Sequence, residues 1–250
     1  MIDIHTHILP GVDDGSQSVR ESMAMARMAW SSGTRVIIGT PHSNQRGRFE
    51  NYYTKDFRTR FKSLRRQLEE RGIPLTVLSG MEIMASDDMR GKLRDGALIS
   101  INRSAYYLVE FPFDSAPGWI SDRLSDIYAV SGIPVIAHPE RYFCVQDHPV
   151  LLYDWMKEGA ELQMNKGSLF GRFGRPAYRL AQLMLRHRLV TCIGSDAHSH
   201  LMRTPHMAEA RRYVSRRYGE DMAQTLFEHN PGRILANEPI AFRADPPAGR

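Results

Sequence analysis

The chain has 250 residues, 42% of them hydrophobic and 24% charged, which is typical of a globular protein with one large core. The formal net charge is +5 at pH 7, but arginines gather at 58–66 and 211–217, where we expect solvated helix faces and no nucleic-acid-binding surface. No membrane span or apolar leader is evident, and two cysteines form no disulfide framework, so we expect a cytoplasmic protein without stable membrane insertion.

Short β-rich apolar runs alternate along the chain with polar loops and helical patterns. The predicted strands are Ile2–Ile4, Arg35–Gly39, Leu75–Leu78, Tyr106–Glu110, Ile133–Ala137, Ala160–Met164 and Leu189–Ile193. Repeated strand–loop–helix units are typical of parallel strands covered by helices, and seven such units favour a closed or nearly closed barrel. An open doubly wound sheet is the alternative.

Two helices have clear sequence signals. The best is predicted over Tyr52–Arg71, where apolar residues recur every three or four positions on one face. A second begins at Ser18, whose spacing to Glu21 is a capping box. We expect one domain over residues 1–237 and a disordered tail over 238–250, which is rich in Pro, Ala, Gly and Arg.

The first fifteen residues, MIDIHTHILPGVDDG, carry the first chemical signal. Side chains two apart on a strand point the same way, so His5 and His7 leave the first strand on one side. Asp13 and Asp14 follow closely enough to reach the same place. Imidazole and carboxylate groups together indicate a metal site, and a merely solvated turn is the alternative.

Potential metal ligands accompany six of the seven predicted strands at or after their carboxyl ends. In a βα barrel these ends form one face, so the groups converge although they are far apart in sequence. Nitrogen and oxygen ligands without cysteine favour Mn, Fe, Zn or Mg ions over a structural zinc. The set is sufficient for three divalent ions and consists of His5, His7, Asp14, His42, Glu82, Glu110, His138, Asp196 and His198.

Longer motifs carry a family resemblance. DIHTHILPGVDDG, AHPERY, QMNKGSLFG and SDAHSHLMRTPHMAEA resemble bacterial protein-tyrosine phosphatases of the polymerase-and-histidinol-phosphatase (PHP) superfamily, which accompany capsule and exopolysaccharide tyrosine kinases. The similarity runs from residue 1 to about residue 237. It implies a distorted (β/α)7 barrel and a manganese-dependent enzyme that hydrolyses phosphotyrosine on a protein, with the tail of such a kinase as the expected substrate.

The resemblance also implies roles for individual residues. Asp14 stands where other members of the superfamily often have histidine. Three ions would be held by three ligand sets: His5, His7, Glu82 and Asp196; Glu82, Glu110 and His138; and Asp14, His42 and His198. Arg141 and Arg203 follow His138 and His198 closely and would bind the phosphate as catalytic residues, while a metal-activated water attacks phosphorus.

Other functions are weighed against the same residues. A cysteine-dependent phosphatase needs arginine six positions after cysteine, where this chain has Val150 and His198, so that class is excluded. Amidohydrolases typically place a metal-bridging lysine at the fourth strand, where this chain has Glu110, which weakens that alternative. Histidinol-phosphate phosphatase is the main alternative, and a non-catalytic metal-binding module is the other.

Two loops are expected to rim a peptide substrate. They are residues 43–51, with Phe49, and residues 165–174, with Phe170 and Phe173. These aromatic rings could stack on a substrate phenyl ring. Ordinary mobile connections are the alternative for both loops.

Overall fold

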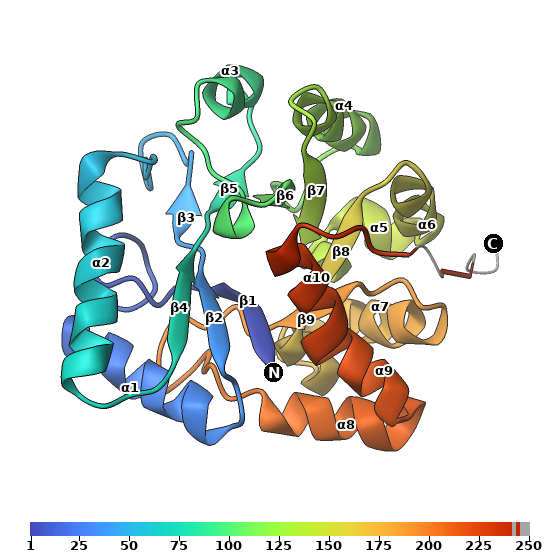
Figure 1. Ribbon diagram of the computed structural model, residues 1–250. Helices are drawn as coiled ribbons and strands as arrows, with labels where there is room; N and C mark the ends of the chain where they lie inside the picture. The colour runs from blue at the N-terminus through green and yellow to red at the C-terminus, as the bar shows by residue number, and fades with distance from the viewer. Residues whose placement is uncertain (242–243, 246–250) are drawn as a thin grey trace.

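A parallel sheet curls through the centre of the molecule, and helices cover its outside (Figure 1). We analysed a computed structural model that describes residues 1–241 and 244–245. One group of strands is hydrogen-bonded in the order β1 (Ile2–Thr6), β2 (Val36–Gly39) and β4 (Thr76–Ser79). The other runs in the order β3 (His42–Ser43), β5 (Glu82–Met84), β6 (Tyr106–Glu110), β7 (Ile133–Ala137), β8 (Glu161–Asn165) and β9 (Cys192–Gly194).

The two groups of strands are joined at two places. Only two residues separate β2 from β3, and only two separate β4 from β5. At the other end, Asp3 Oδ1 accepts a hydrogen bond from Ser195 N over 2.9 Å, and Thr6 forms a parallel bridge with Ala197. The strands follow chain order without the reversal of a doubly wound sheet, so that alternative is wrong.

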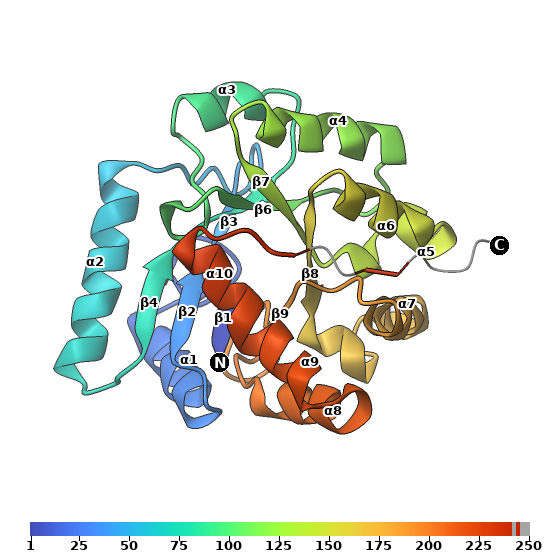
Figure 2. The ribbon, with the colours of Figure 1, turned by 45° about the vertical axis from the view of Figure 1, so that its right-hand side comes forward.

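Helices surround the sheet on its outer side, with α2, α3, α4 and α7 at successive positions (Figure 2). Short helical turns also occur: η1 (Ile101–Arg103), η2 (Pro139–Arg141), η3 (Lys166–Phe170) and a π-helical turn, Thr225–His229. Among the described residues, no helix is long and apolar enough to cross a bilayer. The α-helices are α1 (Val19–Ser31), α2 (Lys55–Glu70), α3 (Met89–Arg94), α4 (Pro117–Tyr128), α5 (Phe143–Asp147), α6 (Val150–Lys157), α7 (Gly174–Arg186), α8 (Ala208–Tyr218), α9 (Glu220–Gln224) and α10 (Asn230–Ala236).

Both helices with clear sequence signals are confirmed. Ser18 caps α1 by accepting a hydrogen bond from Glu21 N. Helix α2 begins three residues later than predicted, because the Thr54 side chain accepts from Phe57 N and sets the first turn there. Its core face consists of Phe57, Phe61, Leu64 and Leu68.

All seven predicted strands exist: Tyr106–Glu110 and Ile133–Ala137 have the predicted boundaries, and the other five are shifted. The largest shift is in the last strand, which starts at Cys192 because Leu189 N still bonds to Met184 O at the end of α7. The short strands β3 and β5 were not predicted. In the tail, Tyr106 donates a hydrogen bond to Glu238 O over 2.6 Å. Disorder over 238–250 stays a prediction, since 242–243 and 246–250 lie outside the described residues.

Glu161, at the start of β8, predicts a pH dependence of stability. Burial raises the pKa of its carboxyl from 4.5 to about 7, although Thr191 donates a hydrogen bond to it. The folded chain therefore binds this proton more tightly than the unfolded chain, and stability falls as pH rises from about 4.5 through about 7. Glu161→Gln removes the buried charge and should raise the free energy of unfolding at pH 8 by about 2–3 kcal/mol.

Urea denaturation at pH 4 and pH 8 measures this difference. The two proteins should be nearly equal at pH 4, where Glu161 is protonated in both states. Glu158→Gln, an exposed change three residues away, serves as the control. An equal gain at both pH values would show that the effect is not electrostatic.

Candidate metal centre

The predicted ligands lie together at the carboxyl ends of the strands. His5 and Glu110 are on β1 and β6, His42 and Glu82 begin β3 and β5, and His138 directly follows β7. His7, Asp196 and His198 lie just beyond β1 and β9, and Asp14 is on the loop after β1. All nine belong to one network of contacts, so the predicted convergence is confirmed as geometry.

Glu82 is at the centre of this network. Its two carboxylate oxygens lie 2.9–3.2 Å from nitrogen atoms of four histidines: His5, His7, His42 and His138. The Glu82 side chain is 1% exposed, so these contacts replace the water that would otherwise solvate its charge. A carboxylate in this position can bridge neighbouring cations.

Three subsets have ligand atoms close enough together to share one ion. Each subset has its ligand atoms within 4.8 Å of one another: His7, Asp14, His42 and His198; His5, His7 and Asp196; and His42, Glu82 and Glu110. These overlap with the predicted ligand sets, but His7 and His42 each belong to two subsets. His138 Nε2 lies 3.0 Å from Glu82 and 3.5 Å from Glu110, beside the third subset.

Two of the histidines are oriented by hydrogen bonds that were not predicted, one to Asp13, which was expected near the site, and one to Gln163, which was not. The Nδ1–H of His7 donates to Asp13 Oδ2 over 2.7 Å, and that of His5 donates to Gln163 Oε1 over 2.8 Å. Both bonds turn Nε2 inward, toward the carboxylates. Asp13 also accepts from Gly15 N over 2.9 Å, and a Cβ at Gly15 would lie 2.3 Å from His7 Cβ.

The backbone turns sharply at two of the ligand positions. His138 has φ 35° and Asp196 has φ 48°, both in the left-handed region that residues with a side chain rarely adopt. Each residue comes directly or almost directly after a strand, where this turn accompanies inward placement of the side chain. Strained conformations of this kind occur mainly where function requires a particular side-chain position.

Opposing charges divide the pKa values of the carboxylates. Burial alone would raise the pKa of Glu82, Glu110 and Asp196. The neighbouring His5 and His42 nevertheless hold the pKa of Glu82 well below its usual range, and His5 does the same for Asp196. Glu110 differs: burial and the negative charges of Glu82 and Asp196 raise its pKa well above normal. Burial lowers the pKa of His138 to about 4, which leaves its imidazole neutral.

The network opens into a cleft of about 280 Å³, whose lining includes Arg141 and Arg203. The Arg141 guanidinium lies between two aromatic rings, 4.4 Å from the Phe113 ring centroid and 4.5 Å from that of Phe173. Its Nη1 is 3.7 Å from Asp196 Oδ2, and Arg203 contacts the same oxygen. Both predicted phosphate-binding arginines therefore face the cleft.

A half-buried lysine holds the loop that carries Arg203. Lys166, at the start of η3, donates hydrogen bonds to Thr204 O and, over 2.8 Å, to His206 O. Burial lowers the pKa of Lys166 to about 8. The predicted rim loop 165–174 thus contributes to the site partly by fixing the neighbouring loop that carries Arg203.

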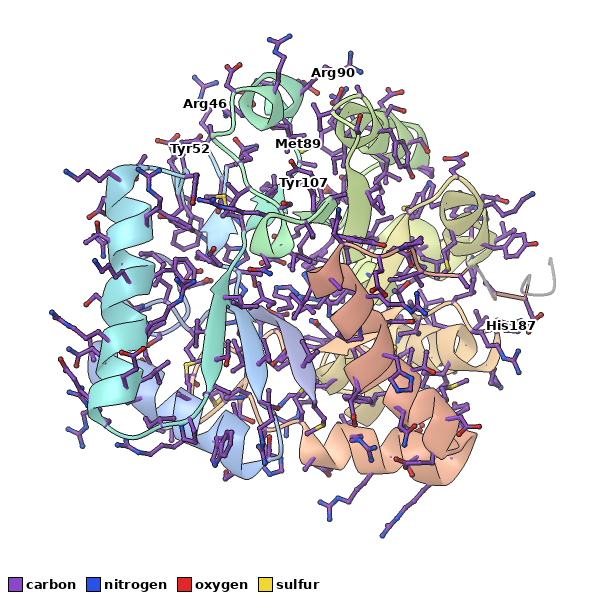
Figure 3. All side chains as sticks on the ribbon, in the orientation of Figure 1. Arg46, Tyr52, Met89, Arg90, Tyr107 and His187 are labelled. Carbon is purple, nitrogen blue, oxygen red and sulfur yellow. The ribbon has the colours of Figure 1, made fainter. Side chains whose placement is uncertain are left out.

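The predicted aromatic rim is only partly correct. Phe49 stacks on His42 with 5.6 Å between ring centroids, and Phe173 stacks on Arg141. Phe170 instead packs 5.7 Å from Tyr213 on α8. None of the three lines the cleft itself, whereas Phe113, which was not predicted, does. The other rim loop, 43–51, runs beside α3, where Arg46 and Tyr52 lie at the outer edge of the molecule (Figure 3).

The residues present fit divalent metal ions. The cluster supplies imidazole nitrogens and carboxylate oxygens, the ligands typical of catalytic zinc, iron and manganese sites. Six of the nine lie on parallel strands or directly after them, which gives the ligand atoms a rigid support. His138 Nδ1 is buried without a hydrogen-bond partner among the described residues, so only Nε2 is directed to a polar group.

Comparison with known proteins gives the family. The family described as "Capsular polysaccharide synthesis, CpsB/CapC" matches residues 1–236, and the chain belongs to it. Tyrosine-protein phosphatase YwqE of Bacillus subtilis is 37% identical, over 98% of this chain and 95% of its own length. Tyrosine-protein phosphatase CpsB of Streptococcus agalactiae is 31% identical, over 96% of this chain and all of its own.

Solved structures agree with this membership. One from a study of YwqE from Bacillus subtilis and CpsB from Streptococcus pneumoniae, described as unique metal-dependent tyrosine phosphatases, superimposes with a TM-score of 0.92 at 36% identity over both full chains. The lactonase Lmo2620 from Listeria monocytogenes has a TM-score of 0.58 at 10% identity and covers 94% of each chain. That second similarity shows the fold alone.

Asp13 is expected to control metal affinity through His7. Asp13→Ala removes the acceptor for His7 Nδ1–H and should weaken manganese binding by about 10–100-fold. Isothermal titration calorimetry of the metal-depleted protein measures this change. Asp13→Asn keeps an acceptor and should recover part of the affinity.

The matched control is Asp122→Ala, which removes an exposed carboxylate on α4. Thermal unfolding of each variant verifies the fold. Equal manganese affinity of Asp13→Ala and Asp122→Ala would exclude a role for Asp13 in the site.

Proposed function

We propose that this protein is a metal-dependent protein-tyrosine phosphatase. The observation that carries the proposal is a cleft lined by six of the nine predicted ligands together with Arg141 and Arg203, with the other three ligands in contact with those six. The relatives named tyrosine-protein phosphatase extend over nearly the whole chain. A neutral substrate would not need two arginines beside so many metal ligands, whereas a phosphate dianion does.

The site is proposed to bind three divalent ions, with manganese the first choice and iron, zinc or magnesium the alternatives. Overlap among the ligand subsets supports bridging, with Glu82 placed to serve two ions. The curled sheet is proposed to be a distorted (β/α)7 barrel of the PHP type over residues 1–237. The two-residue breaks at 40–41 and 80–81 support this, because β2 with β3 and β4 with β5 then count as single strands.

Each group in the cleft has a distinct task in phosphate-ester hydrolysis. Bound divalent ions lower the pKa of water and neutralise charge on phosphate oxygens. The Arg141 and Arg203 guanidinium groups hold the non-bridging oxygens by charge-assisted hydrogen bonds. Phe113 offers an apolar surface to the phenyl ring. A phenol has a pKa near 10, so the leaving phenolate departs with less proton transfer than an alkoxide requires.

The proposed substrate is phosphotyrosine on a protein, with the tail of a capsule or exopolysaccharide tyrosine kinase as the expected partner in the cytoplasm. The cleft supports this because Arg141 and Arg203 line it as donors for a phosphate and Phe113 lines it as a surface for a phenyl ring. Neither cysteine has the surroundings of a nucleophile. Burial raises the pKa of Cys144 and, more strongly, that of Cys192.

A substrate panel tests the proposed function. With manganese present, kcat/KM should be highest for a phosphotyrosine peptide, compared with a phosphoserine peptide, histidinol phosphate and single-stranded DNA. Chelation should abolish turnover, and Cys144→Ser combined with Cys192→Ser should leave it largely intact. Preference for histidinol phosphate would transfer the protein to the alternative function, and faster DNA cleavage would overturn both.

Arg141 is expected to stabilise the transition state without holding metal. Arg141→Ala should lower kcat/KM on a phosphotyrosine peptide by about 10²-fold or more, because a charge-assisted donor to the phosphate is lost. Arg141→Lys should be intermediate, since it keeps the charge but not the two-donor geometry.

Steady-state kinetics and metal analysis on the same samples distinguish the roles. Arg175→Ala, on the exposed side of α7, controls for the general loss of positive charge. An Arg141→Ala protein with full activity, or with less bound metal, would contradict the assignment.

A further inference from the structure

A second groove lies on the outer wall of the sheet, away from the metal centre. It has a volume of about 800 Å³ and runs between α2 and β4, with Asn102 and Arg103 of η1 also among its lining residues. Figure 1 shows helix α2 on the left side of the molecule and strand β4 as the long strand beside it. The groove shares no lining residue with the cleft at the metal ligands.

One side of this groove is the unpaired edge of a strand. Strand β4 is hydrogen-bonded only to β2 among the described strands. Thr76 N and Gly80 N bond to Arg35 O and Gly39 O on that side. Because donors alternate along a parallel strand, the N–H groups of Val77 and Ser79 face the other way, toward the groove. An edge of this kind is a template for another strand.

The groove is also rich in uncompensated positive charge. Arg58, Arg65 and Arg103 all line it, all are exposed, and none forms an ion pair with another described residue. Arg58 and Arg103 converge, with their Cζ atoms 5.2 and 5.5 Å from the ring centroid of Tyr53. Arg65 Nε instead donates to Val77 O over 2.7 Å, on the strand edge itself.

Two other arginines on α2 do form ion pairs. Arg60 pairs with Asp56 over 2.7 Å, and Arg66 pairs with Glu70 over 3.5 Å. The only carboxylate among the groove-lining residues is Glu69. Of the four arginines on α2, the two outside the groove lining are therefore paired with carboxylates, and the two that line the groove are not.

We propose that this groove binds an extended acidic segment of a partner protein, which adds to β4 as an extra strand. The strand edge requires an extended backbone, and Arg58 and Arg103 require acidic side chains, while Arg65 has to release Val77 O for the added strand to pair with it. The four residues of β4 offer about 13 Å of edge at a rise of about 3.3 Å per residue. The proposal does not depend on the hydrolytic activity, because the two sites are lined by different residues.

Fluorescence anisotropy of the full chain with a labelled ten-residue peptide of alternating Glu and Thr tests the charge requirement. The double variant Arg58→Glu, Arg103→Glu should weaken binding at least tenfold. The matched double variant Arg60→Glu, Arg66→Glu changes the total charge by the same amount, with both substitutions on α2 and outside the groove lining, and should bind almost as the unmodified chain does. Equal weakening by both, or by neither, would overturn the proposal.

Two methylated peptides test the strand addition on the unmodified protein. In one, the backbone nitrogens of the odd residues are methylated, and in the other those of the even residues. Only one set faces β4, so one peptide should lose at least tenfold in affinity and the other should not. Equal binding of both at the parent affinity would exclude strand pairing.

Two further measurements complete the test. The Arg58→Glu, Arg103→Glu protein should hydrolyse p-nitrophenyl phosphate at the rate of the unmodified chain, which shows that the fold and the metal centre are intact. A single-stranded oligonucleotide that binds more tightly than the acidic peptide, with the same sensitivity to the variants, would overturn the choice of partner.

Discussion

The buried carboxylate of Glu82 is the constraint on which the rest of the site depends. A negative charge without water must be paired, and here histidines that enter from β1, β3 and the end of β7 provide the partners. Contacts to one side chain thus fix the relative positions of strands that are distant in sequence. The same demand explains why Glu110, with fewer partners and two negative neighbours, has a raised pKa.

The strand pattern was predictable because parallel strands buried on both faces are continuous apolar runs. The breaks that divide β2 from β3 and β4 from β5 were not predictable. Pro41 and the Gly80–Met81 pair interrupt two of those runs, and a Cβ at Gly80 would lie 3.0 Å from Ile38 Cγ2, a contact that only the packed sheet creates. Helix α2 was predicted through its apolar face, but its first residue depends on the Thr54 cap, which periodicity does not specify.

The candidate ligands were predictable for a related reason: strand ends meet on one face, so residue type and position suffice. Supporting residues lack that signal. Gln163 lies inside β8 and reads as a core position, and only its 2.8 Å contact with His5 shows its role. Asp13 was placed near the site but not assigned a partner, because DDG offers two carboxylates and the backbone turn decides which one meets His7. Phe170 was predicted to rim the cleft, but its ring packs against Tyr213 of α8, a contact between distant segments that the sequence does not indicate.

The left-handed backbone at His138 and Asp196 has an evolutionary consequence. Glycine is the residue that adopts this conformation most easily, so a change to glycine would relieve backbone strain at either position, but it would also remove a partner of the buried charges around Glu82 or the two arginines. The reverse change would have to accept the strain before any ligand function returned. Recovery of the centre from a glycine-bearing descendant therefore has to restore a strained backbone and a ligand in the same step.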